Sequence, residues 1–120
     1  MKKAGWKKKI KEATEAAGTY QPFFDGVIDT LADILAKRDD AQALYEASGN
    51  QAVVKHTNKG GATNIAKNPA LVVISELNTQ ALAYWRDLGL TPAGLKKINE
   101  AAMKEKKRSA LVEALSLFDG

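Results

Sequence analysis

The amino-acid sequence predicts an all-α fold, built as a helical hairpin core with a short loop or minor β-hairpin insertion. Two observations lead to this prediction. Apolar residues recur at helical spacing over most of the 120 residues, which is typical of amphipathic helices. Proline or glycine stands where these patterns start and stop, as expected at helix ends. The length suits one domain with its own core.

The first predicted helix is basic and only thinly apolar. Gly18 ends it, since glycine readily adopts the left-handed backbone conformation that closes helices. Its apolar residues follow the spacing i, i+4, i+7 and i+11: Trp6, Ile10, Ala13 and Ala17. We therefore expect residues 1–20 to form a basic N-terminal arm or helix.

A stronger helix is predicted after Gln21-Pro22, because proline is favoured in the first turn of a helix. Its apolar stripe contains Phe24, Ile28, Leu31 and Leu35, widened by Val27 and Ile34. On the other side, acidic residues repeat every four positions: Asp25, Asp29 and Asp33. Carboxylates spread along one helix face do not converge on a metal ion. We expect them to form a solvated or inter-subunit face.

Between Gly49 and Lys67 the helical pattern breaks. Two short segments, Val53-Val54 and residues 62–65, flank the sequence Asn58-Lys59-Gly60-Gly61. This arrangement is compatible with a short hairpin around a glycine turn and equally with an ordered loop.

The third predicted helix has the most regular pattern. Asn68-Pro69 supplies an N-cap residue and a first-turn proline, and Gly89 ends the helix. Thr91-Pro92 then starts a fourth helix by the same device. The third helix has a heptad seam formed by Leu71, Ile74, Asn78, Ala81, Trp85 and Leu88.

The two long helices carry more large apolar side chains than one small core can hide, which indicates self-association. Asn78 would fix the register of that contact as a buried asparagine does in coiled coils. The expected oligomer interface comprises Phe24, Ile28, Leu31, Leu35, Ile74, Asn78 and Trp85. Residues 21–103 would thus form a helical oligomerisation core.

The final segment, residues 104–120, is predicted to be a partner-binding tail. It begins with a polar, lysine-rich stretch and ends with an apolar patch of Leu111, Leu115 and Phe118. The patch is too short to form a stable helix alone. It could dock into the groove of a partner or fold back to cap the subunit's own core.

Chemical motifs argue against an enzyme. Without cysteine the chain has no disulfide, thiol catalysis or thiolate metal site. Gly60-Gly61 follows Lys59, the reverse of the order in a phosphate-binding Walker loop, and His56 is the only histidine. We therefore expect no catalytic residue, metal or cofactor. No apolar run approaches the roughly 20 residues of a membrane span, so we expect no membrane partner.

Charge is distributed unevenly along the chain. Residues 22–47 carry six acids against two basic residues, whereas the first eleven residues carry no acid. The lysines expected to contact a polyanion are Lys2, Lys3, Lys7, Lys8, Lys9 and Lys11 in the first helix, and Lys96 and Lys97 in the fourth. Two basic ends around an acidic middle indicate nucleic-acid binding, although basic termini can also serve solubility alone.

Four features, in this order, resemble the small subunit of phage terminases from cohesive-end tailed phages. They are a long helix over residues 24–45, a glycine-containing connector, the helix start Asn68-Pro69-Ala70-Leu71, and Gly89-Leu90-Thr91-Pro92 opening the next helix. The resemblance covers residues 20–100. Lys96 and Lys97 stand later than the basic residue of that family.

The resemblance implies a non-catalytic protein of the host cytoplasm that assembles into a homo-oligomeric ring. Its partners would be double-stranded viral DNA and the large terminase subunit. Two alternatives remain open from the residues alone. One is a homo-oligomeric DNA-binding regulator or nucleoid-type protein, and the other is an interaction module whose basic helix touches anionic membrane.

Overall fold

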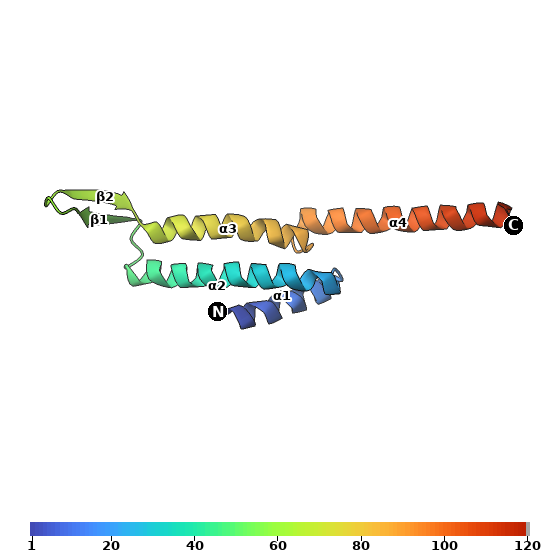
Figure 1. Ribbon diagram of the computed structural model, residues 1–120, viewed down its shortest axis with the longest axis horizontal. Helices are drawn as coiled ribbons and strands as arrows, with labels where there is room; N and C mark the ends of the chain where they lie inside the picture. The colour runs from blue at the N-terminus through green and yellow to red at the C-terminus, as the bar shows by residue number, and fades with distance from the viewer. Residues whose placement is uncertain (120) are drawn as a thin grey trace.

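The computed structural model describes residues 1–119, and the side chains of residues 1–117. The molecule is elongated, with extents of 87 × 25 × 21 Å. Helices α2 and α3 run side by side in opposite directions, α1 lies along α2, and α4 continues beyond α3 (Figure 1). The elements are α1 (Lys3–Ala17), the 3-10 turn η1 (Pro22–Phe24), α2 (Asp25–Ala47), β1 (Val53–Thr57), β2 (Thr63–Lys67), α3 (Pro69–Asp87) and α4 (Pro92–Asp119). The prediction of an all-α fold with a minor β-hairpin is confirmed.

Helix α2 is the centre of the core because it is covered on two sides. Six of its residues are buried: Ile28, Leu31, Ala32, Ile34, Leu35 and Ala41. Helix α1 adds Ile10 to this cluster, and the end of α3 adds Ala81 and Leu88. Burying each large aliphatic side chain contributes about 1.5–3 kcal/mol. A core this small therefore depends on both neighbouring helices.

Three residues assigned by sequence to an oligomer interface lie in this core. Ile28 is 3% exposed, and Leu31 and Leu35 are fully buried. They cannot contact a second chain while the subunit keeps this fold. The sequence treats α1 as an arm, whereas the structure docks α1 on α2 and thereby covers part of the apolar stripe.

Asn68 joins the hairpin to the helices. Its side-chain oxygen accepts a hydrogen bond from the Ala70 N–H at 3.1 Å, which caps α3 as the sequence predicts. Its amide nitrogen donates to Ser48 Oγ at 3.1 Å and to the Gln51 carbonyl at 2.8 Å. This one buried side chain therefore links the end of α2, the root of the hairpin and the start of α3.

The connection from α3 to α4 is tight. Gly89 has a φ of +73°, and the Leu90 N–H donates to the Trp85 carbonyl at 2.9 Å, closing α3 as expected of a glycine C-cap. Gly94 then passes against the end of α3, since a Cβ added there would lie 2.1 Å from the Arg86 carbonyl oxygen. Close backbone contact thus fixes where α4 leaves the body.

Helix α4 is continuous through the polar stretch 104–109 that the sequence interprets as a tether. Residues 101–117 are all exposed. Figure 1 shows this part of α4 extending past the end of α3 without contacting the other helices. The described part of the C-terminal segment does not fold back on the core.

We expect Gly94→Ala to destabilise the fold by about 1–3 kcal/mol, the usual effect of overpacking a tight site. Gly26→Ala is the matched control, because a Cβ at Gly26 meets nothing within 4 Å and alanine favours helix by up to about 1 kcal/mol. Urea unfolding midpoints measure both. Equal midpoints for the two variants would show that the α3–α4 contact does not constrain the fold.

Candidate nucleic-acid interface

The basic N-terminal segment is a docked helix. Lys3 and Lys7 pair with Asp29 on α2 at 3.2 and 3.1 Å. Part of the positive charge of residues 1–20 therefore forms ion pairs that help to hold α1 on α2. The repeat of acids on α2, expected to be solvated or to meet another subunit, includes the carboxylate that binds α1.

A second contact fixes the start of α1. The Asp39 carboxylate accepts hydrogen bonds from the Met1 amino group and from Trp6 Nε1, both at 2.8 Å. Arg38 approaches the same carboxylate at 3.3 Å and lies 5.5 Å from the Trp6 ring centroid. Trp6 is therefore held between a hydrogen bond and a cation–π contact.

These contacts lower the pKa values of both carboxylates on α2. Hydrogen bonds from Lys7 and Lys3 hold the pKa of Asp29 below its usual range. For Asp39, partial burial acts to raise the pKa, but hydrogen bonds from the N-terminal amine, Trp6 and Arg38 outweigh it and the net pKa is lowered. Both groups therefore favour the docked state of α1 only while ionised.

Three lysines of α1 and Lys2 just before it remain exposed without an ion pair in the described part of the chain: Lys2, Lys8, Lys9 and Lys11. Lys9 lies 5.2 Å from the Trp6 ring and Lys11 lies 5.2 Å from the Tyr20 ring. Positive charge at a helix N-terminus opposes the helix dipole, and α1 has no acid in its first turn and no side-chain N-cap. Helix stability therefore does not explain this lysine cluster.

The lysines of α4 form a separate surface. Lys96 and Lys97 are exposed, and Lys96 is only loosely paired with Glu100 at 4.0 Å. The start of α4 lies near Thr19, which donates a hydrogen bond to the Leu88 carbonyl at 2.8 Å. Thr19 follows the C-terminal end of α1, about 25 Å along the helix from Lys2. The lysines at the start of α1 are therefore apart from Lys96 and Lys97, whereas Lys11, which lies over the Tyr20 ring, is at the end of α1 nearer α4.

The remaining interface candidates are partly accessible. Phe24, Ile74 and Trp85 are half-buried. Asn78 is exposed and accepts a long hydrogen bond of 3.4 Å from Arg38, so within the subunit it sits at the edge of the α2–α3 contact. The sequence places Val73 beside the heptad seam of this helix, and the structure leaves it exposed. Sequence reasoning missed two further exposed apolar residues of α3, Val72 and Leu82. Their positions off the heptad seam were the available signal.

The apolar end of α4 is unpartnered within the subunit. Leu111 and Leu115 are 61% and 55% exposed. The structure adds Val112 and Leu117, which the sequence analysis did not name and which are 60% and 83% exposed. The side chain of Phe118, the third predicted residue, lies outside the described side chains.

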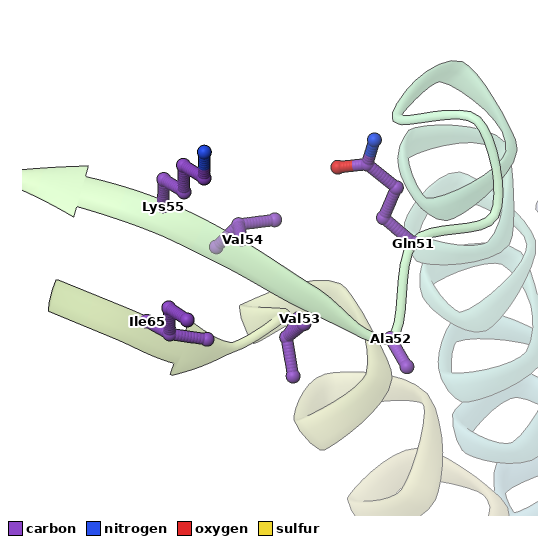
Figure 2. Close-up of a pocket in the computed structure, with 6 residues that line it drawn as sticks. All are labelled: Gln51, Ala52, Val53, Val54, Lys55 and Ile65. Carbon is purple, nitrogen blue, oxygen red and sulfur yellow. The ribbon is translucent and has the colours of Figure 1, made fainter.

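Metal ligands and surface hollows are the remaining features of the described residues. They contain no group of three or more His, Asp or Glu side chains placed to hold a metal ion. A hollow of about 640 Å³ lies at the root of the hairpin, and Lys55 is the only charged residue among the six that line it (Figure 2). None of the helices described here is long and apolar enough to cross a membrane.

A comparison with known protein families identifies the family of this chain. The family model described as "Phage terminase, small subunit" matches residues 3–105. The chain belongs to the phage terminase small-subunit family. The match includes α1 as well as the region of the sequence resemblance. No curated protein and no solved structure matches the chain significantly.

Membership gives this terminase small subunit a role in phage genome packaging. The family is in general a non-catalytic component. The matched region ends at residue 105, before the exposed apolar part of α4. The body and the first half of α4 therefore lie inside the family match, whereas the apolar end of α4 lies outside it.

We expect acid to weaken the docking of α1. Because the pKa of Asp39 is lowered on folding, its contribution is full above the ordinary value of about 3.9 and is lost as pH falls through the folded value. Between pH 7 and pH 3, urea midpoints should fall less for Asp39→Asn than for the natural chain. Asp40→Asn, at an exposed neighbouring position, is the control. Equal pH dependence of the natural chain and Asp39→Asn would contradict this assignment.

Proposed function

We propose that this terminase small subunit binds double-stranded viral DNA and presents it to the large terminase subunit in the host cytoplasm. It does so without enzymatic activity. The observation that carries the proposal is the cluster of unpaired lysines on α1, a helix that lies inside the family match. Phosphate contacts supply most of the affinity of such surfaces and do not depend on base sequence.

Assembly into a homo-oligomeric ring would multiply this charge. One subunit offers only a few free lysines on α1, but several copies binding one duplex gain affinity through their high effective concentration. The exposed apolar side chains of α3, together with Ile74, Asn78 and Trp85, support an interface on that helix. Exposed apolar patches are typical of surfaces that contact another protein chain.

The C-terminal half of α4 would bind the large subunit. Exposed leucines on a projecting helix suit recognition by an apolar groove. The tight α3–α4 connection at Gly94 holds the helix away from the body. The patch also lies beyond the family match, as expected of a segment adapted to one particular partner.

Lys2→Ala and Lys8→Ala should each weaken binding to any DNA duplex. A slope near −0.9 in log affinity against log salt for each phosphate means that one lost contact costs about eightfold at 0.1 M salt. Fluorescence anisotropy over a salt series measures both slope and affinity. Lys37→Ala is the control, because Lys37 pairs with Asp33 on α2 at 2.8 Å. If all three variants bind as the natural protein does, α1 is not a DNA contact.

Ending the chain after Arg108 tests the role of α4. The removed residues that the structure describes contact no other element, so the unfolding midpoint, assembly and DNA affinity should stay unchanged. Stimulation of the large subunit's ATPase should be lost. A truncated protein that loses its assembly or its thermal stability would show that the segment is structural.

A further inference from the structure

The β1–β2 hairpin protrudes from the end of the α2–α3 pair opposite α4 (Figure 1). Its strands pair antiparallel, from Val53 opposite Lys67 to Thr57 opposite Thr63. Apart from half-buried Val54, every strand residue is exposed. An isolated two-stranded hairpin is only marginally stable in water. What holds this hairpin and what it meets therefore need an explanation.

Both ends of the hairpin are fixed by asparagine side chains. At the tip, Asn58 Oδ1 accepts hydrogen bonds from the Gly60 N–H at 3.0 Å and the Ala62 N–H at 3.1 Å. At the root, Asn68 binds Ser48 and Gln51 as described above. Figure 2 shows Gln51 and Ala52 leading directly from α2 into β1. The hairpin is thus presented by the helices in a set direction.

The hairpin region is purely basic. No acidic residue occurs between Glu46 and Glu76, whereas Lys55, Lys59 and Lys67 do. This contrasts with the acid-rich α2 that precedes it. Charge complementarity therefore favours a polyanion as the occupant of this surface.

One face of the ribbon combines this charge with hydrogen-bonding groups. Side chains two positions apart share a face of a strand, so Lys55 and Thr57 share a face with their partners Ile65 and Thr63. Lys67, opposite Val53, lies on the same face. Lysine suits phosphate oxygens, and threonine can contact base edges. Lys59 stands in the turn, where it would reach the phosphates first.

We propose that this hairpin is a second DNA-binding element, a β-ribbon that inserts into the major groove of the bound duplex. The groove is about 12 Å wide and admits a two-stranded ribbon, and five-residue strands of about 17 Å reach through its depth. The proposal rests on the proposed DNA-binding function. It assigns a DNA contact to lysines that are distant from those of α1 and α4.

The test uses the full chain, a 50-base-pair duplex and a salt series. The triple variant Lys55→Ala, Lys59→Ala, Lys67→Ala should flatten the log–log slope by up to about 2.7 for three phosphates. Arginine at the same three positions keeps the charge and should keep the slope. If the natural chain binds no DNA, the proposed function fails. If the natural chain binds and the alanine variant binds equally well, only the ribbon proposal is overturned.

A contact measurement separates the ribbon from a subunit interface. The chain has no cysteine, so a photo-crosslinker on Ala62→Cys labels the hairpin tip alone. It should capture DNA, whereas the same group on Glu113→Cys, on exposed α4, should not. Capture of another protein copy in place of DNA, or a lower assembly mass for the alanine variant, would overturn the proposal.

Discussion

The structure depends on the burial of α2 between two helices. Its apolar residues point both toward α1 and toward α3, and neither contact alone would cover them. With so few fully buried large side chains, the loss of one neighbour removes a sizeable share of the hydrophobic stabilisation. The placement of the hairpin and of α4 follows, because both are attached to the ends of α3, the helix packed most extensively against α2.

The lysines of helix α1 therefore fall into two groups. Lys3 and Lys7 hold it on Asp29, while other lysines of the same helix face solvent. Exposed ion pairs are weak, so Ile10, Trp6 and the buried Thr14 supply most of the docking. This is why single lysine substitutions are a cleaner probe of DNA binding than removal of the first eleven residues, which would also take Trp6 and Ile10 out of the core.

Helix positions were predictable from local rules. Asn68-Pro69 and Thr91-Pro92 carry cap and first-turn proline signals that do not depend on tertiary contacts, and the structure confirms both starts. The pairing of α1 with α2 was not predictable, since one amphipathic face on α1 does not reveal which surface covers it. For the same reason, Leu31 and Leu35 were assigned to an oligomer interface although α1 and α3 bury them.

The sequence predicts which basic residues are candidates for the site, but it does not predict where they lie relative to one another. The lysine clusters are visible in the sequence, but the separation of the start of α1 from Lys96 and Lys97 depends on how α4 leaves the body at Gly94. The hairpin lysines were overlooked because they are spaced through a segment with two possible structures. Only pairing places Lys55 and Lys67 on one face.

We propose above that this small subunit acts as an assembled DNA-binding protein. Native mass spectrometry of the full chain at micromolar concentration, alone and with a short duplex, tests it most directly. We expect one closed homo-oligomer as the dominant mass, and the same oligomer carrying one duplex when DNA is added. A monomer in both samples would contradict the account.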